Sequence, residues 1–347
     1  MPSPPLLDVN DLHVRFPTPN GHVYAVAGVS FTVSPGETVA VVGESGSGKS
    51  VSSLAVMGLL GGGDISAGSV RLRGEELVGA DPERLRRLRG SEIAMIFQNP
   101  MSSLDPLFTV GDQIIEAMRA HRRVSRRAAR ARAVELLREV GLPDPERRIR
   151  AYPHELSGGQ QQRVMIAIAL ACEPSMIIAD EPTTALDVTV EAQILDLLRR
   201  TQRDHGTALL LITHDMAVVA EMADRVVVMY AGRVVEHGPV ADVLRSPSNP
   251  YTQALIDSIP TPATPRDAPM PAIGGNVPTP AEAPPGCRFH PRCPSAFDRC
   301  SRAEPPLLDV ALLDVGDVGV GRASRCWLHD ETAPSRGVGA GEVHRVG

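Results

Sequence analysis

The chain has 347 residues, 43% of them hydrophobic and 22% charged, a composition typical of a globular protein with one large domain or two. Its formal net charge of −6 and its pI near 5.9 argue against a protein that coats nucleic acid. The longest apolar run, Val164 to Cys172, is about half of the ~20 residues that a membrane span needs, and the first residues lack the pattern of a secretory signal. We therefore expect a cytoplasmic protein with mostly reduced thiols.

Apolar β-rich runs alternate with helical patterns up to about residue 258, the rhythm of a mainly parallel sheet. Between Val110 and Ala171 the strand signal disappears and helical periodicity takes over, which predicts an inserted helical subdomain over about residues 104–171. The predicted strands are SFTV (30–33), TVAVVG (38–43), EIAMIFQ (92–98), SMIIAD (175–180), ALLLIT (208–213) and RVVVMY (225–230).

The run after the second of these strands predicts a phosphate-binding loop. It fits the pattern G-x-x-x-x-G-K-[ST] in the strand-to-helix context that a P-loop requires. The glycines let backbone N–H groups face phosphate, and the helix N-terminus adds its positive end. The hydroxyl of Ser50 is expected to bind Mg²⁺. The predicted triphosphate-binding residues are Gly43, Glu44, Ser45, Gly46, Ser47, Gly48, Lys49 and Ser50.

Lys49 is the only lysine of the chain, and every other position in its Lys+Arg total of 35 is arginine. A compact ammonium reaches between the β- and γ-phosphates, whereas the planar guanidinium of arginine is bulkier. We interpret the exception as the mark of a catalytic site. Survival of one lysine against a compositional bias is the alternative.

A basic run from Arg119 to Ala133 carries seven arginines at spacings that occupy much of a helix surface. A solvated helix face is the favoured interpretation. Contact with lipid headgroups or with an acidic partner is the alternative.

The segment LSGGQQQR, Leu156 to Arg163, opens an apolar helical run, and a serine with two glycines at a helix N-terminus predicts a second anion-binding surface. Together with the P-loop it resembles the signature of the ATP-binding-cassette (ABC) ATPase family. The resemblance implies that Ser157, Gly158, Gly159 and Gln160 contact the γ-phosphate held by an opposite subunit.

Two carboxylates end the apolar strand SMIIAD and its continuation. Asp180 is placed to hold the Mg²⁺ shell, and Glu181 to polarise an attacking water as general base. A solvated loop pair is the alternative for such a sequence.

Other site residues follow from the family resemblance, position by position. Gln98 in IFQNPMSSLDP matches the glutamine that reaches metal and water and links the site to the membrane partner. Asp187 in TALD matches the loop that crosses the dimer interface, and His214 in LITHD matches the histidine that contacts the γ-phosphate. For stacking on adenine the candidates are Phe16 and Tyr24, with Phe16 favoured, although either can be plain packing.

The C-terminal part changes composition. A proline-rich linker is predicted at residues 259–286, a cysteine-bearing segment at 287–330 and a disordered tail at 331–347. The cysteines follow the spacing C-x5-C-x6-C-x25-C, which suits tetrahedral zinc or a [4Fe–4S] cluster without deciding between them. They are Cys287, Cys293, Cys300 and Cys326. Thiols without any metal are the third possibility, and Cys172 is predicted to be a buried core residue.

Over nearly its whole length the chain is similar to the ATPase subunits of oligopeptide and dipeptide importers. The discriminating stretches are SPSNPYTQALIDSIP and GCRFHPRCPSAFDRC. The resemblance implies an α/β P-loop NTPase fold: an ABC nucleotide-binding domain (1–258) with a RecA-like core, an antiparallel β subdomain and a helical subdomain, plus a small cysteine-containing extension. It also tips the cysteines toward iron–sulfur rather than zinc.

The implied cofactors are ATP and Mg²⁺. The implied partners are two transmembrane permease subunits, a second ATPase subunit that is a paralogue or a second copy, and, indirectly, an extracytoplasmic solute-binding protein. The location would be the cytoplasmic face of the membrane, with no nucleic acid bound. Nickel and glutathione importers share much of the pattern, and an ABC ATPase acting on nucleic acid or ribosomes is the rival hypothesis.

Overall fold

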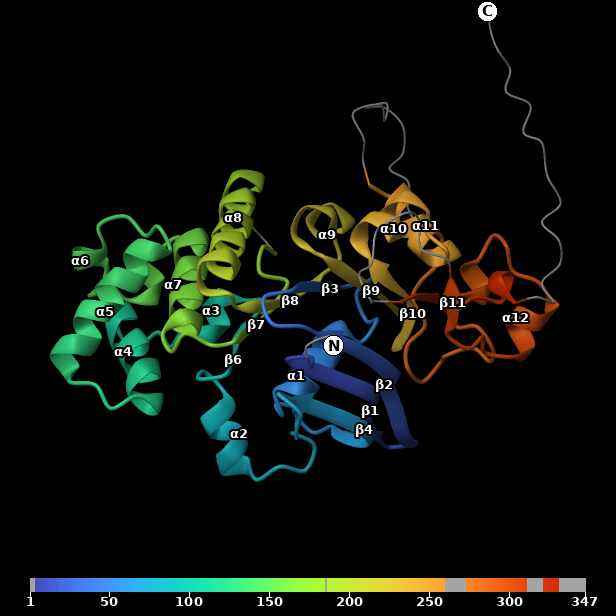
Figure 1. Ribbon diagram of the computed structural model, residues 1–347, viewed down its shortest axis with the longest axis horizontal. Coiled ribbons are helices and arrows are strands. Elements are labelled where there is room, and N and C mark those ends of the chain that lie inside the picture. Colours follow the sequence, from blue (N-terminus) through green and yellow to red (C-terminus); the bar gives the residue numbers. More distant parts are fainter. Residues whose placement is uncertain (1–3, 185, 260–272, 311–320, 331–347) are drawn as a thin grey trace, which may run out of the picture.

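The computed structural model describes residues 4–184, 186–259, 273–310 and 321–330. It is elongated, with a group of helices at one end, the cysteine-bearing segment at the other and the sheets between them (Figure 1). The predicted linker lies partly, and the predicted tail wholly, outside the described residues.

The main sheet has eight strands in the order β11-β12-β10-β9-β3-β8-β7-β6. Its five strands from β9 to β6 run parallel, as the alternation of strand and helix patterns predicts. The strands are β3 Thr38–Val42, β6 Ile93–Ile96, β7 Met176–Asp180, β8 Ala208–Thr213, β9 Arg225–Tyr230, β10 Arg233–Pro239, β11 Leu308–Val310 and β12 Arg322–Ser324.

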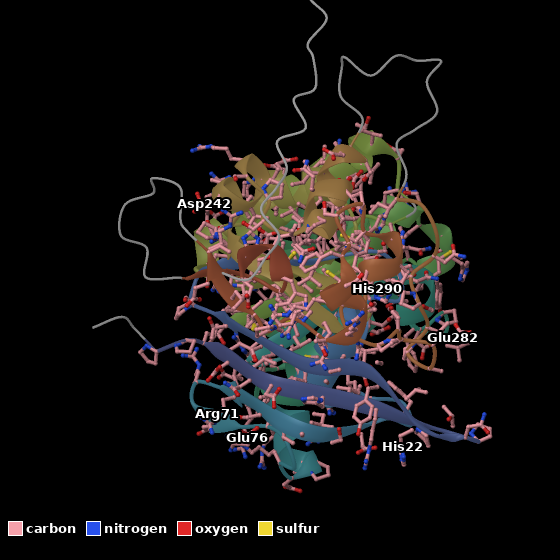
Figure 2. The ribbon with its side chains drawn as sticks, turned by 90° about the vertical axis from the view of Figure 1, so that its right-hand side faces the viewer. His22, Arg71, Glu76, Asp242, Glu282 and His290 are labelled. Carbon is pink, nitrogen blue, oxygen red and sulfur yellow. The ribbon has the colours of Figure 1, made fainter. Side chains whose placement is uncertain are left out.

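A second, antiparallel sheet has the order β2-β1-β4-β5 and forms a layer below the rest of the molecule, marked in Figure 2 by His22, Arg71 and Glu76. The predicted strand at 30–33 is only the end of its long strand β2. Glycine and serine in β4 weaken its strand signal, and pairing with β1 supplies what local propensity lacks. The strands are β1 Leu7–Thr18, β2 Gly21–Val33, β4 Asp64–Leu72 and β5 Glu75–Glu76.

Helices occupy the segments between the strands, and residues 104–171 contain helices alone. No helix of the described part is both long and apolar enough to cross a membrane. The helices are α1 Lys49–Val56, α2 Pro82–Leu88, α3 Pro100–Ser103, α4 Val110–His121, α5 Arg126–Glu139, α6 Pro145–Arg148, α7 Gly158–Leu170, α8 Val188–His205, α9 Met216–Met222, α10 Val240–Arg245, α11 Pro250–Asp257 and α12 Asp298–Arg302, with short 3-10 turns η1 Pro153–Glu155, η2 His290–Arg292 and η3 Trp327–His329.

The arginine-rich run does not cover a single helix. It spans the end of α4, a loop and the start of α5, because the side chain of Ser125 caps α5 by accepting a hydrogen bond from the backbone N–H of Ala128. Within α5, Arg132 pairs with Glu139 at 2.6 Å, so part of the run is engaged in ion pairs on the helix surface.

The core lies on both faces of the main sheet, because successive residues of a strand point to opposite sides. In β8, Leu209 and Leu211 pack toward the helical region, whereas Leu210 and Ile212 pack toward the antiparallel sheet and α1. Strands buried on both faces read as continuous apolar runs, which is why these strands were recognisable in the sequence.

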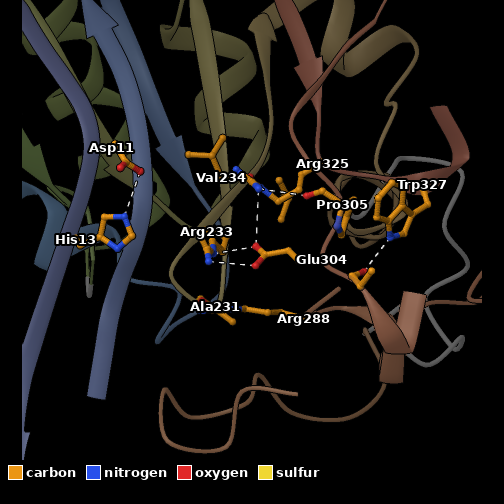
Figure 3. A network of polar contacts seen from close by, with 12 residues as sticks. Asp11, His13, Ala231, Arg233, Val234, Arg288, Glu304, Pro305, Arg325 and Trp327 are labelled. Atoms are coloured by element: carbon orange, nitrogen blue, oxygen red, sulfur yellow. Dashed lines mark hydrogen bonds and ion pairs between the residues drawn. The ribbon is translucent and has the colours of Figure 1, made fainter. Parts of the chain in front are cut away.

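The cysteine-bearing segment extends the main sheet. Its strand β12 pairs antiparallel with β10, and β11 pairs with β12. A fully buried ion pair joins β10 to β12, with 3.1 Å between Nη2 of Arg322 and Oε1 of Glu236. Elsewhere in this segment, Glu304 lies between Arg233 and Arg325, with nitrogen–oxygen distances of 2.9 and 3.7 Å (Figure 3).

Candidate active site

Four adjacent parallel strands bring the predicted catalytic residues to one edge of the main sheet. The strands β3, β8, β7 and β6 are neighbours, and their carboxyl ends lie on the same side. Gly43 follows β3, His214 follows β8, Glu181 follows β7, and Gln98 comes two residues after β6. Ligands of open parallel sheets bind at such an edge.

The P-loop joins β3 to α1, and its glycines are needed where the backbone turns sharply. Gly48 has φ +95°, and a Cβ there would lie 2.6 Å from the carbonyl oxygen of Ala25. The loop also rests on the turn between β9 and β10, where the backbone N–H of Gly232 donates to the carbonyl of Ser47 at 2.9 Å. A neighbouring strand and a neighbouring turn therefore hold the loop in shape.

The side chain of Lys49 is buried and folds back over its own loop. Its Nζ donates to the carbonyl oxygens of Gly43 at 2.7 Å and Glu44 at 3.0 Å. Burial lowers the pKa of Lys49, and the carboxylates around it oppose that shift. The ammonium is thus at the mouth of the loop, where a phosphate can replace the two carbonyls.

Ser50 and Asp180, which were each predicted to bind Mg²⁺, lie next to one another. The hydroxyl of Ser50 donates to Oδ1 of Asp180 at 3.0 Å. Burial raises the pKa of Asp180, and the hydrogen bond from Ser50 works against this rise. A hydroxyl and a buried carboxylate beside a phosphate-binding loop are oxygen ligands of the kind that Mg²⁺ prefers.

Glu181 is the centre of a polar cluster. Its Oε2 accepts hydrogen bonds from Nε2 of Gln98 at 2.8 Å and from the hydroxyl of Thr184 at 2.9 Å. Its Oε1 lies 3.3 Å from Nδ1 of His214. The side chain of Glu181 is 15% exposed and that of His214 is 61% exposed, so the carboxylate is largely enclosed and the imidazole faces outward. The backbone at Glu181 adopts φ +45°, a conformation uncommon for a non-glycine residue.

Thr184 is a member of this cluster that the sequence analysis missed. The signal was present in the stretch EPTT, where a hydroxyl stands three residues after the carboxylate, but serines and threonines in loops are too common to single one out.

The signature residues form the N-terminus of α7. Ser157 and Gln160 exchange hydrogen bonds in a capping box, with the N–H of Ser157 donating to the side chain of Gln160 at 3.2 Å. Gly158 faces open space, while a Cβ on Gly159 would lie 2.7 Å from the side chain of Val190 in α8. Asp187 caps α8 by accepting from the N–H of Val190 at 3.0 Å, so the signature and Asp187 are neighbours. In the described part of the chain, no hydrogen bond or ion pair connects them to the P-loop.

The two candidate aromatic residues differ in exposure. Phe16 is partly buried against the core beneath the antiparallel sheet, and its ring fills the space beside Gly63. Tyr24 is 42% exposed and meets His13 edge to face, with 6.4 Å between the ring centroids.

The four C-terminal cysteines all line one small pocket, together with Phe289 and Trp327. They are unpaired thiols, and Cys172 is a buried thiol in the core near α7. Burial, followed by the neighbouring thiols, raises the pKa of Cys326 to about 12, and burial raises that of Cys287 to about 11. Across the described ranges, however, no three Cys, His, Asp or Glu side chains form a group that could hold a metal ion as they stand.

Tyr251 and Arg292 also contact the P-loop, and sequence reasoning found neither. The N–H of Glu44 donates to the hydroxyl of Tyr251 at 2.8 Å, and Arg292 forms an ion pair with the carboxylate of Glu44 at 2.8 Å. Both lie more than 200 positions from the loop in sequence, with separations of 207 and 248, so only the fold brings them to it.

Two known protein families and several curated relatives match this chain. The protein family described as "ABC transporter" matches residues 26–184. The family described as "Oligopeptide/dipeptide transporter, C-terminal region" matches residues 235–300. The chain is 49% identical over 328 residues to the oligopeptide transport ATP-binding protein AppD of Bacillus subtilis, covering 94% of this chain and 97% of AppD. It is 50% identical over 303 residues to the dipeptide transport ATP-binding protein DppD of Haemophilus influenzae, covering 87% and 92%.

Solved structures agree with these relatives. A dimeric ATP-binding cassette, MJ0796, in a post-hydrolysis state bound to ADP and Pi, matches with a TM-score of 0.62 and 30% identity, over 67% of this chain and 98% of that one. The cassette cbiO1 of Clostridium perfringens matches with a TM-score of 0.60 and 28% identity, over 70% and 92%. These similarities confirm the predicted α/β cassette fold and the resemblance to peptide importers. They give no support to the rival hypothesis of an ATPase that acts on nucleic acid.

Proposed function

Because this chain belongs to the ATP-binding subunits of oligopeptide and dipeptide ABC transporters, we propose that it hydrolyses ATP to power the import of peptides. One observation carries the proposal: Glu181, the P-loop and their supporting residues converge at one sheet edge, in a chain that also matches the C-terminal region of peptide transporters.

The roles of the site residues follow from their positions. Lys49 would exchange its two carbonyl partners for the β- and γ-phosphates, and the N–H groups of the P-loop would bind the remaining oxygens. Ser50 and Asp180 would hold Mg²⁺, and Gln98 would reach it as a further ligand. When bound, Mg²⁺ supplies charge neutralisation to the phosphate oxygens.

Glu181 is the proposed general base. Its carboxylate is fixed by hydrogen bonds from Gln98 and Thr184, which leaves one oxygen near His214 to accept a proton from an attacking water. The exposed His214 would contact the γ-phosphate while remaining beside Glu181.

Two ATPase subunits would complete each site. The signature residues from Ser157 to Gln160 and the neighbouring Asp187 lie together, without a polar link to their own P-loop. They would bind the γ-phosphate of the ATP held by an opposing subunit, a paralogue or a second copy of this chain. Phe16 is the proposed stacking partner of adenine, with Tyr24 the alternative.

The assembly would lie at the cytoplasmic face of the membrane. We expect two transmembrane permease subunits to bind it and an extracytoplasmic binding protein to deliver the solute. Within this chain we propose the domain boundaries that the sequence indicates: residues 1–258 for the cassette and 287–330 for the extension.

For the four C-terminal cysteines we propose a [4Fe–4S] cluster rather than zinc. The support is that all four line one pocket and that the resemblance to peptide-importer ATPases favours iron–sulfur. Because burial raises the pKa of Cys326, a cluster would have to displace the thiol proton on binding, and the side chains would have to move together to hold it.

Iron and acid-labile sulfide contents of anaerobically purified protein, with its visible absorbance, test the cluster. We expect the Cys326→Ser variant to lose iron and the Cys172→Ser variant to keep it. Zinc in place of iron, or no metal at all, would overturn this part of the proposal.

The transport function is tested with the chain, its permease subunits and its partner ATPase in proteoliposomes. We expect peptide-loaded binding protein to stimulate ATP hydrolysis several-fold, and a matched complex carrying Glu181→Gln to stay inactive. Basal hydrolysis without a response to peptide, but with a response to nickel- or glutathione-loaded binding protein, would refute the peptide substrate.

A further inference from the structure

A short stretch of the cysteine-bearing segment reaches the P-loop. Arg292, next to Cys293, forms two parallel hydrogen bonds to the carboxylate of Glu44: Nη1 to Oε2 at 2.8 Å and Nη2 to Oε1 at 3.0 Å. The side chain of Arg292 is 6% exposed and that of Glu44 is 28% exposed. A two-point, largely enclosed arginine–carboxylate pair is among the stronger polar contacts of proteins.

Arg292 is held in place by the surrounding chain. Its Nε donates to the carbonyl of Gly274 at 2.7 Å and its Nη2 to the carbonyl of Ile273 at 3.1 Å. Its guanidinium lies over the ring of Tyr230, with 5.7 Å to the ring centroid. The guanidinium is therefore presented to Glu44 in a preset orientation.

Two neighbours of Arg292 support the same loop indirectly. Arg288 donates to the carbonyl of Ala231, which precedes the glycine whose N–H binds Ser47 (Figure 3). Phe289 packs against Tyr251, the residue whose hydroxyl accepts from the N–H of Glu44, with 5.2 Å between ring centroids. The stretch between Cys287 and Cys293 thus contacts the P-loop directly through Arg292 and indirectly through Arg288 and Phe289.

Glu44 is an electrostatic problem for a loop that binds a polyphosphate. Glu44 belongs to the P-loop, and its backbone carbonyl accepts a hydrogen bond from Nζ of Lys49. The loop that must bind the negatively charged phosphates therefore itself carries a carboxylate. An unpaired carboxylate at this place would repel the nucleotide, and the repulsion would be strong because the surroundings are partly buried. Arg292 cancels that charge.

We infer that Arg292 is a positioning residue of the nucleotide site: it neutralises Glu44 and holds the P-loop, and through it the cysteine-bearing segment sets the affinity for ATP. The inference rests on the ATP site of the proposed function, but not on the transported solute. Arg292 acts through Glu44 and touches no reacting atom.

The test is the dissociation constant of full-length protein for ATP, measured with a fluorescent ATP analogue and competing ATP. Arg292→Gln should raise that constant about tenfold, the size expected for loss of one charge-assisted contact. Arg292→Lys should raise it less, because an ammonium keeps the charge but makes one contact. The exposed Arg302→Gln, which breaks an ion pair with Asp298 in the same segment, is the matched control and should change nothing.

The double variant separates charge cancellation from a merely structural role. Glu44→Gln combined with Arg292→Gln should recover most of the affinity lost in Arg292→Gln, because the double variant leaves no uncompensated carboxylate on the loop. The loss should also shrink at high salt, which screens the exposed part of Glu44.

Unchanged affinity in Arg292→Gln would overturn the inference, as would a double variant as weak as the single one. Failure of the unaltered chain to bind ATP would instead refute the proposed ATP site, so the two failures are distinguishable.

Discussion

Nε2 of Gln98 donates to Oε2 of Glu181 at 2.8 Å, which links the loop after β6 directly to the residue after β7. Gln98 precedes the helical region of residues 104–171, whereas Glu181 lies at the edge where ATP would bind. A shift of the helical region relative to the sheet therefore moves the residue that holds the proposed base. This contact would couple a movement of the helical region to the position of the proposed base.

Replacement of Glu181 by Gln should separate binding from turnover. The amide keeps the size of the side chain but cannot accept a proton, so hydrolysis should fall by ~100-fold or more, the usual contribution of a general base. ATP binding should persist, because Lys49 and the P-loop are untouched. Parallel measurement of ATP affinity and phosphate release checks this, and full hydrolysis in the variant would remove Glu181 from its role.

The charged side chain of Asp180 should lower the stability of the nucleotide-free protein, although Mg²⁺ binding requires it. Its pKa is raised in the folded protein by burial, so the folded state holds its proton more tightly than the unfolded one. The charged form therefore lowers stability at neutral pH, and this penalty disappears as pH falls through the raised pKa. We expect Asp180→Asn to increase the thermal stability of nucleotide-free protein while abolishing Mg²⁺-dependent hydrolysis.

Asp64→Asn is the control for that comparison. Asp64 is half-exposed and pairs with Arg15 at 3.0 Å on the surface, so its loss should change stability little. A less stable Asp180→Asn protein, measured by thermal unfolding at neutral pH without Mg²⁺, would contradict the expected sign.

Gly48 should tolerate no side chain. In Gly48→Ala a new methyl group would meet the carbonyl of Ala25 at 2.6 Å in addition to straining a backbone at φ +95°. Gly46→Ala is a matched control, because Gly46 also has a positive φ of +79° but nothing within 4 Å of the added carbon. Gly46→Ala should cost ~1–2 kcal/mol of unfolding free energy, from backbone strain alone.

Gly48→Ala should cost clearly more than Gly46→Ala and should also weaken ATP binding more, since its clash displaces the loop. Chemical denaturation and nucleotide titration of both variants measure the difference. Equal effects would show that the contact with Ala25 relaxes without consequence.

The buried pair of Glu236 and Arg322 should be essential for attaching the C-terminal strands. Glu236→Gln leaves the guanidinium of Arg322 without its charge partner inside the sheet, which typically costs about 3–5 kcal/mol of unfolding free energy. Glu83→Gln, which breaks an exposed pair with Arg86, should change stability little, because solvent screens such a pair. Urea denaturation of the two variants distinguishes the cases, and similar losses would contradict a structural role for the buried pair.

Site residues could be predicted from the sequence only where their immediate neighbours form a recognisable pattern. Residues of the P-loop, Asp180 and Glu181 could be found in the sequence because each follows an apolar strand directly, and their order along the chain identifies the fold. Thr184 could not be singled out, because one threonine in a loop has no periodic or charged context. The antiparallel sheet was similarly faint, since β4 contains residues with weak strand propensity and is stabilised by pairing with β1.

By itself, the sequence determined the parallel strands, the phosphate-binding loop and the two carboxylates at the end of β7. These are recognised from patterns of neighbouring residues: the apolar runs of strands buried on both faces, and the glycines that the backbone requires. Only the tertiary structure decided that Arg292 pairs with Glu44, that Tyr251 supports the same loop and that the four C-terminal cysteines share a pocket. Such contacts join residues far apart in sequence, and no local pattern records them, because their energy depends on burial and orientation that exist only after the chain has folded.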